Sequence, residues 1–254
     1  MSTPRRNEWF DDDAFWQDFS PLLFSDTRFA EAHEHVEKVL TLTNPPGTAA
    51  LDLCCGPGRF AIALAQRGFS VTGVDRTAFL LDKAKERAQV AQVTIEWVQQ
   101  DMRDFVQPDS FDLVLSMFTS FGYFDSPQDD ILVLRNMLTS LRPGGKCLID
   151  VMGKERLART FQATTSELLP DGTTVVQRHE IVDDWTRVRN EWILLRMGRA
   201  KHYTFGLTVY SGRELRDRMQ QVGFVDVRLY GNLDGDAYGL NAQRLITVGR
   251  KPDA

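Results

Sequence analysis

The sequence predicts an α/β fold built on a seven-stranded, mostly parallel sheet, with an antiparallel β insertion that forms a lid. Two observations carry this prediction. Short apolar runs alternate with stretches of helical periodicity between residues 48 and 152. After about residue 153 the chain changes to β-branched and aromatic stretches divided by turn residues. The first pattern is typical of a parallel sheet with helices on both faces, and the second is typical of antiparallel strands.

The first half of the chain supplies five strands and the helices between them. An amphipathic helix with Phe29, Ala32, Val36 and Val39 on one face precedes the first strand. The strands are expected at 48–53, 69–75, 93–99, 111–118 and 146–152. Helices are expected at 58–68, at 77–90, and in a third segment with Ile131, Leu134, Leu138 and Leu141 on one face. Ligands bind such sheets beyond the carboxyl ends of the strands, where the strand order reverses.

The second half of the chain completes the sheet. Residues 173–210 read as antiparallel strands of an inserted lid, and residues 211–224 as a helix with Ser211 as its N-cap. Two final strands are expected at 225–231 and 244–251.

Net charge, apolar runs and cysteine count argue against several kinds of partner and ligand. The formal charge is -5, and no block of five or six like charges occurs, so no nucleic-acid partner is expected. No apolar leader and no run of about 18 apolar residues is present, which predicts a cytoplasmic protein without a membrane partner. The three cysteines fit neither a disulfide framework nor a zinc site, so no metal is expected.

The stretch "LDLCCGPGRF" joins a buried strand to a helix through two glycines. Gly56 and Gly58 let a ligand approach the main chain and the free N–H groups at the helix N-terminus. With Ala61 they satisfy G-x-G-x-x-A, and Asp75 ends the next strand, so a dinucleotide competes as the ligand. A nicotinamide-dependent oxidoreductase is therefore kept as an alternative assignment of enzyme class.

Three carboxylates favour a nucleoside that carries an amino acid. Asp52 precedes the glycines, where a carboxylate opposes a pyrophosphate and attracts an ammonium group. Asp101, beside the apolar Met102, suits the amine edge of an adenine, and Asp75 suits a ribose diol. One zwitterionic nucleoside satisfies all three.

Five motifs occur in order along the chain: "LDLCCGPGRF", "VTGVDRT", "QQDMRDF", "FDLVLSMFTSFGYF" and "LRPGGKCLIDV". In these motifs, and in their order over residues 28–152, the chain resembles the class I S-adenosylmethionine-dependent methyltransferases, which have a Rossmann-like fold. Small-molecule members, including sugar-amine and glycine N-methyltransferases, are the most similar. The chain departs from the first motif at Arg59, where a third glycine is usual.

The resemblance implies a role for each motif position. Asp52 and the main chain at Cys54, Gly56 and Gly58 would surround the methionine part of S-adenosyl-L-methionine. Asp75 would bind the ribose, Arg76 would lie against the adenine, and Asp101 with Met102 would border its amine edge. Met117 and Phe118 would place main-chain atoms near the sulfonium.

The sequence defines less clearly which residues would contact the methyl acceptor. Tyr123 is the candidate catalytic contact, Phe121 and Phe118 are expected to form an apolar wall, and His179 of the lid is a candidate substrate contact or base. The aromatic N-terminal segment around Trp9 and Trp16 either folds over the pocket or packs onto the core.

The predicted organisation is one methyltransferase domain over residues 1–254. Its parts are an N-terminal cap and helix (1–46), a cofactor-binding core (47–152), the β lid (153–208), and a closing helix with two strands (209–254). The expected reaction moves a methyl group to a nitrogen or oxygen of a small molecule. A non-catalytic S-adenosylmethionine-binding module is a second alternative, and a homodimer remains open.

Overall fold

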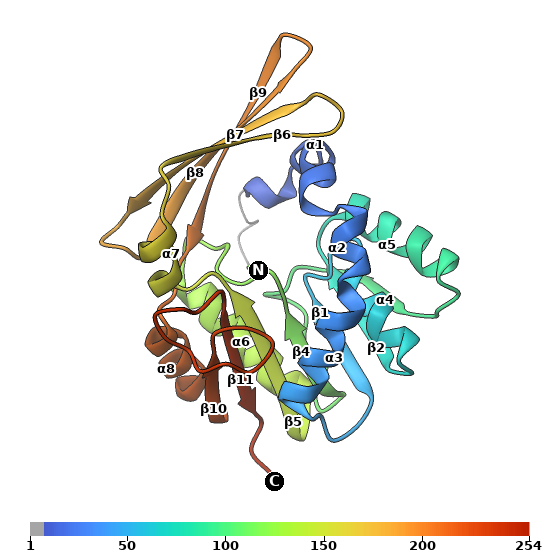
Figure 1. The fold of residues 1–254 in the computed structure, drawn as a ribbon. Coiled ribbons are helices and arrows are strands. Elements are labelled where there is room, and N and C mark those ends of the chain that lie inside the picture. Colours follow the sequence, from blue (N-terminus) through green and yellow to red (C-terminus); the bar gives the residue numbers. More distant parts are fainter. Residues whose placement is uncertain (1–7, 254) are drawn as a thin grey trace, which may run out of the picture.

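The computed structural model describes residues 8–253 and contains two β-sheets. The larger sheet has seven strands in the order β10-β11-β5-β4-β1-β2-β3 (Figure 1). Its strands are β1 (Ala49–Leu53), β2 (Ser70–Asp75), β3 (Glu96–Gln99), β4 (Phe111–Ser116), β5 (Leu141–Val151), β10 (Val225–Tyr230) and β11 (Leu245–Arg250). Strands β1 to β5 pair in parallel, whereas β11 is antiparallel to both β5 and β10. The predicted mostly parallel sheet is confirmed.

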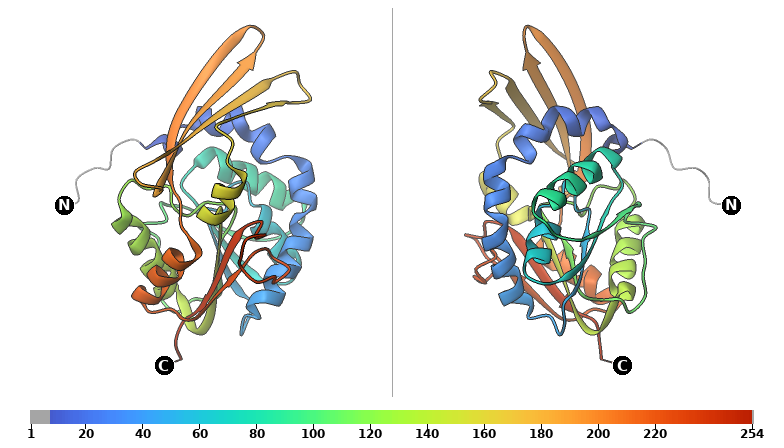
Figure 2. Two further views of the ribbon diagram at one scale, coloured as in Figure 1. Left: turned by 60° about the vertical axis from the view of Figure 1, so that its left-hand side comes forward. Right: turned by 90° about the vertical axis from the view of Figure 1, so that its right-hand side faces the viewer.

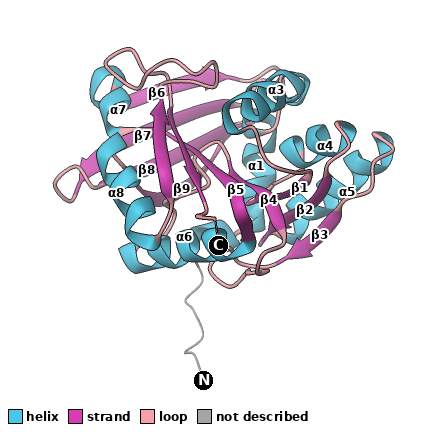
Figure 3. Ribbon diagram, turned by 90° about the horizontal axis from the view of Figure 1, so that it is seen from below, coloured by secondary structure: helices cyan, strands magenta, loops and turns pink. Residues whose placement is uncertain are grey.

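Helices cover both faces of this sheet (Figure 3). They are α3 (Ala32–Thr43), α4 (Arg59–Gln66), α5 (Ala78–Val90), α6 (Pro127–Ser140) and α8 (Gly212–Val222). Residues of β1 alternate between two hydrophobic clusters: Ala50 packs with residues of α3 and α4, while Leu51 and Leu53 pack with residues of α6 and α8. This alternation is the period-two pattern of a strand that is buried on both sides.

The smaller sheet is antiparallel and projects away from the main sheet (Figure 2). It contains β6 (Thr164–Leu168), β7 (Thr174–Val182), β8 (Arg187–Arg196) and β9 (Arg199–Thr208). The predicted antiparallel sheet of the insertion is therefore confirmed, and β6 to β9 together are named the lid sheet. A short helix, α7 (Lys154–Thr160), precedes it, so the strands begin later than residue 153.

The N-terminal segment lies between the lid sheet and the main domain (Figures 1 and 2). It contains a 3-10 turn, η1 (Trp9–Asp11), and helices α1 (Asp13–Leu23) and α2 (Asp26–Ala30). Asp12 caps α1 by accepting a hydrogen bond from the main-chain N–H of Ala14 at 2.9 Å. Phe19 of α1 packs on Trp192 of β8 with ring centroids 5.0 Å apart, so α1 is held by the lid.

Two element boundaries differ from the sequence prediction. The helix expected ahead of the first strand is divided at Glu31 into α2 and α3. Leu141 was expected on the apolar face of a helix, but it is the first residue of β5. It pairs with Phe111 of β4 and remains fully buried, so its hydrophobicity serves the sheet.

Candidate functional site

A cavity lies beyond the carboxyl ends of β1, β2, β3 and β4, on both sides of the point where the strand order reverses. Ten of the residues predicted for the site line it: Asp52, Cys54, Gly56, Asp75, Arg76, Asp101, Met102, Met117, Phe118 and Tyr123. Three others do not, namely Gly58, Phe121 and His179. The topology therefore gathers side chains from four separate motifs at one sheet edge.

The glycine turn after β1 uses its two glycines for different purposes. Gly56 lines the cavity with φ +53°, and its N–H donates to the Asp75 carboxylate at 2.8 Å. Gly58 lies behind the cavity lining, with φ +83° at the N-terminus of α4. A Cβ there would stand 2.9 Å from the Trp97 ring, so the absence of a side chain serves internal packing.

Two buried carboxylates line the cavity beside this turn. Asp52 is 2% exposed and accepts a hydrogen bond from the N–H of Ala61 at 3.0 Å. Burial raises the pKa of Asp52 to about 7. Asp75 accepts from the N–H groups of Gly56 and Thr77, and burial raises its pKa too. Because a carboxylate has about four lone-pair sites, each acid can accept further hydrogen bonds from a ligand.

The acid after β3 has a different environment from the one that the resemblance implies. The two Asp101 oxygens accept hydrogen bonds from the Arg76 guanidinium at 2.9 Å and from the Arg103 guanidinium at 2.7 and 3.0 Å. Burial opposes ionisation of Asp101, but the Arg103 hydrogen bonds and charge hold its pKa below the ordinary value. Asp101 therefore fixes two arginines at this end of the cavity.

Arg103 and Glu8 were not anticipated from the sequence. Arg103 is 4% exposed and binds Glu8, Asp101 and Asp129, with Nη1 3.1 Å from a Glu8 oxygen and from an Asp129 oxygen. Arg76 also pairs with Glu8, at 3.1 Å. In the sequence, Arg103 is marked only by its positive charge directly after Met102. Hydrophobic periodicity does not predict which residues such a charge binds.

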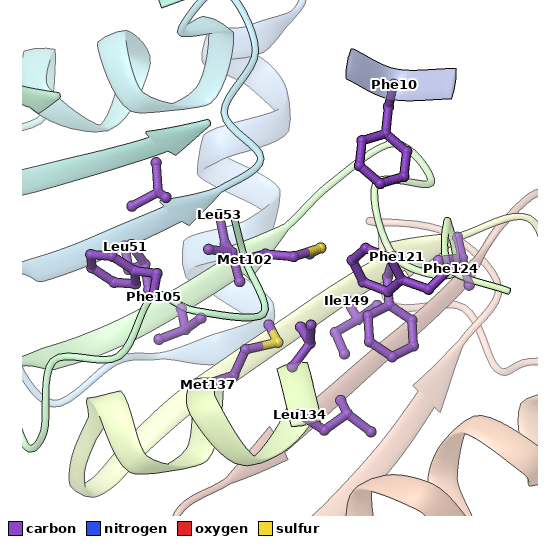
Figure 4. Close-up of a cluster of buried hydrophobic side chains, with 14 of the residues drawn as sticks. Phe10, Leu51, Leu53, Met102, Phe105, Phe121, Phe124, Leu134, Met137 and Ile149 are labelled. Carbon is purple, nitrogen blue, oxygen red and sulfur yellow. The ribbon is translucent and has the colours of Figure 1, made fainter. Parts of the chain in front are cut away.

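The N-terminal segment forms the roof of the cavity. Its lining residues are Phe10, Trp16, Leu23, Phe24 and Arg28. The Phe10 ring points from η1 toward the hydrophobic cluster that contains Phe121 and Phe124, and its centroid lies 5.8 Å from that of Phe124 (Figure 4). The aromatic N-terminal segment was expected either to fold over the pocket or to pack onto the core, and each interpretation holds for part of it. Phe10 and Trp16 cover the cavity, whereas Phe15 and Phe19 pack against the lid sheet.

Among the acceptor-side candidates, only Tyr123 and Phe118 line the cavity. Phe121 is 1% exposed and packs on Tyr210 in the core. His179 lies on β7, where its Nδ1 is 2.7 Å from the Asn190 side-chain oxygen. Burial raises the pKa of Tyr123, so its hydroxyl keeps its proton at neutral pH and is able to donate a hydrogen bond.

Within residues 8–253, no group of three or more His, Cys, Asp or Glu side chains is arranged to hold a metal ion. In the same part of the chain, none of the helices combines the length and the apolar character that a membrane-spanning segment requires.

Comparison with known proteins shows what this part of the chain resembles. Residues 50–145 match the family model described as a methyltransferase domain. Over these residues the chain is therefore similar to methyltransferase domains. The resemblance predicted from the five motifs is confirmed. The match includes Gly56, Asp75 and Asp101, three of the residues that line the cavity.

Individual proteins that resemble the methyltransferase domain agree. The ubiquinone biosynthesis O-methyltransferase of Coxiella burnetii (strain Dugway 5J108-111) is 30% identical over 145 residues, which are 55% of this chain and 59% of that protein. The chain spans about half to three fifths of the length of the curated relatives it matches.

Two solved structures have the same fold over nearly their whole length. A S-adenosylmethionine-dependent methyltransferase from Clostridium acetobutylicum ATCC 824 aligns with TM-score 0.77 and 14% identity, covering 94% of this chain and 98% of that one. The sugar N-methyltransferase KedS8 from Streptoalloteichus sp ATCC 53650 aligns with TM-score 0.71 and 20% identity, covering 100% and 98%. The likeness to KedS8 includes the lid, since all of this chain is covered.

Proposed function

We propose that the protein binds S-adenosyl-L-methionine in this cavity and transfers its methyl group to a nitrogen or oxygen of a small molecule. One observation carries the proposal. The cavity joins a buried acid in β1, a main-chain turn at Gly56, and a buried acid at the end of β2. Asp52 suits an ammonium group, and Asp75 suits a ribose diol while it holds the turn.

S-adenosyl-L-methionine supplies a methyl group on a sulfonium, and its transfer leaves a neutral thioether. The chain contributes orientation and exclusion of water, which lower the barrier of such a displacement. The roof residues Phe10 and Trp16 support the second role because both are buried and line the cavity. Tyr123 would orient an acceptor by donating a hydrogen bond, since its raised pKa disfavours a role as base. The Cys54 thiol also keeps its proton, because burial raises its pKa well above the ordinary value. A protonated thiol is a poor nucleophile, so Cys54 is unsuitable for that role.

The names of similar proteins support a small acceptor. The Coxiella relative is named an O-methyltransferase of ubiquinone biosynthesis, and KedS8 a sugar N-methyltransferase. The roof residues Phe10 and Trp16 cover the cavity, which suits a small acceptor better than a long polyanion. The proposal keeps the four-part division of the domain, with residues 153–208 as the lid. A cytoplasmic location and a homodimer are further parts of it, tested by cell fractionation and by light scattering.

Calorimetry tests the cofactor. Heat of binding with S-adenosylhomocysteine and none with NAD or NADP supports the proposal, and the reverse pattern supports the oxidoreductase. Formation of S-adenosylhomocysteine is then measured across a panel of amines, sugars, phenols and carboxylates. Tight cofactor binding without turnover on the whole panel would instead favour a non-catalytic binding module.

A further inference from the structure

The turn after β4 has an unusual backbone conformation. Phe118 has φ +55° and Thr119 has φ +68°, so two successive residues with side chains lie in the left-handed region. This region is disfavoured for residues that carry a Cβ, and most of all for β-branched residues such as threonine. Within residues 8–253, the other run of this kind without glycine, 183–185, lies in the exposed loop between β7 and β8. The turn after β4 instead borders the cavity, because Phe118 and Ser120 line it.

One residue of the neighbouring strand binds both N–H groups of this turn. Asp150, the last residue but one of β5, is 2% exposed. Its Oδ2 accepts a hydrogen bond from the Phe118 N–H at 3.1 Å, and its main-chain oxygen accepts one from the Thr119 N–H at 2.8 Å. Asp150 therefore stabilises a backbone conformation that is otherwise unfavourable.

Arg244, directly before β11, completes this arrangement. Its Nε donates to the Asp150 carboxyl at 2.6 Å, and its Nη2 donates to the Thr119 hydroxyl at 3.0 Å. Its guanidinium carbon also lies 5.5 Å from the centroid of the Phe118 ring. Arg244 thus contacts the side chains of both left-handed residues and the acid that binds their N–H groups. Because Arg244 does not itself line the cavity, it acts on a ligand there through the turn.

The position of the turn gives a reason to fix it. The turn follows β4, which flanks the point where the strand order reverses, and the residues Met117 and Tyr123 on either side of it also line the cavity. Methyl transfer requires the sulfur, the methyl carbon and the acceptor atom to lie on one axis. A displacement of roughly 1 Å can cost such a reaction about 100-fold in rate. A cavity wall built on left-handed residues keeps its shape only while the contacts that stabilise it are in place.

We propose that Asp150 and Arg244 are positioning residues, which hold the turn at residues 117–120 against the methyl-bearing end of S-adenosyl-L-methionine. This inference rests on the proposed function and on the expectation from the sequence that main-chain atoms of Met117 and Phe118 lie near the sulfonium. Asp150 and Arg244 act through the main chain of the turn. They therefore affect the ligand that carries the transferable methyl group more than the product that lacks it.

The test compares two ligands that differ in this methyl group and its positive charge. Isothermal titration in the absence of an acceptor measures the dissociation constants of S-adenosyl-L-methionine and S-adenosylhomocysteine for the wild type and for Arg244→Gln. We expect the substitution to weaken S-adenosyl-L-methionine about tenfold, as for a lost polar contact to a charged group, and S-adenosylhomocysteine less than about threefold. Arg250→Gln serves as the control, because it removes an ion pair with Asp226 at the other end of β11 and should change neither constant.

A second substitution separates positioning from packing. Glycine adopts positive φ readily, so Thr119→Gly in the Arg244→Gln background should return the ratio of the two constants to within about threefold of the wild type. Loss of packing alone does not produce this recovery, because Thr119→Gly also removes the hydroxyl that Arg244 binds. Arg244→Lys keeps the charge but not the planar fork, and it provides the same comparison if Arg244→Gln does not fold.

Equal weakening of both ligands, or no weakening of either, overturns the inference. A double variant that shows no recovery of the ratio overturns it as well. In these cases a wild type that binds both ligands leaves the proposed function intact. A wild type that binds neither ligand refutes the proposed function, and the inference fails with it.

Discussion

Asp52→Asn should stabilise the ligand-free protein at alkaline pH while weakening its binding of cofactor. Asp52 is 2% exposed, and burial raises its pKa from 3.8 to about 7. Its hydrogen bond from the Ala61 N–H at 3.0 Å is one that an asparagine oxygen can also accept. The substitution therefore removes a desolvated charge and keeps the local hydrogen bond.

The magnitude follows from the two pKa values. The native state holds the Asp52 proton more tightly than the unfolded chain, so the free energy of unfolding falls as pH rises from 3.8 to about 7. At about 1.4 kcal/mol per pKa unit, the full penalty is about 4 kcal/mol above pH 7. At pH 5 the penalty is less than about half of this, because native Asp52 is still protonated and pH 5 lies only about one unit above the pKa of the unfolded aspartate, out of the roughly three units that separate the two pKa values.

Urea unfolding at pH 5 and pH 8 measures this difference. We expect Asp52→Asn to raise the free energy of unfolding at pH 8 by about 2 to 4 kcal/mol, and by clearly less at pH 5. S-adenosylhomocysteine should bind the variant about tenfold more weakly, as expected for a lost charged partner of the ammonium group. Asp217→Asn on the surface of α8, where the aspartate is 53% exposed, is the matched control and should leave the unfolding free energy within about 0.5 kcal/mol of the wild type.

A variant that is less stable than the wild type at pH 8 would refute this reasoning. So would a gain of equal size at both pH values, because the argument requires Asp52 to change its protonation between them.

Three further predictions concern other parts of the site. Asp75→Ala should weaken S-adenosylhomocysteine binding by about 1 to 3 kcal/mol in calorimetry, and an unchanged constant in a folded variant would remove Asp75 from the site. Glu8→Gln should speed cofactor dissociation in stopped-flow experiments at least about threefold, because it weakens the pairing of the roof with buried Arg103; an unchanged rate contradicts the role of the roof. Gly58→Ala should lower the unfolding free energy by about 1 to 3 kcal/mol, because its φ is +83° and a Cβ would lie 2.9 Å from Trp97; a neutral effect in urea unfolding contradicts the packing role.

The main sheet could be predicted from the sequence because each of its strands has a local sequence pattern. Buried runs such as 48–53 and 69–75 are bounded by glycines or turn residues, and their alternation with helical segments fixes the parallel order. Leu141 was assigned to the wrong element because a single leucine satisfies a helical face and a buried strand equally well. Only its pairing with Phe111 decides between them.

The candidate site was predictable where it follows a strand end, and not where distant segments meet. Asp52 and Asp75 lie in the last two residues of their strands and Asp101 lies just after β3, so topology alone brings them together. The pairing of Arg103 with Glu8 joins residues 95 positions apart and depends on the path of the N-terminal segment, which has no periodic signature.

The ion-pair arrangement around Arg103 has an evolutionary consequence. This one guanidinium joins three stretches of chain: the 3-10 turn at the amino terminus, the loop after β3, and the first turn of α6. A mutation of residue 8 alone would remove one of the three acids that pair with buried Arg103, and a mutation of residue 103 alone would leave those acids without the cation that they share. Natural variants should therefore exchange the two positions in concert, and an alignment of close homologues would display that covariation.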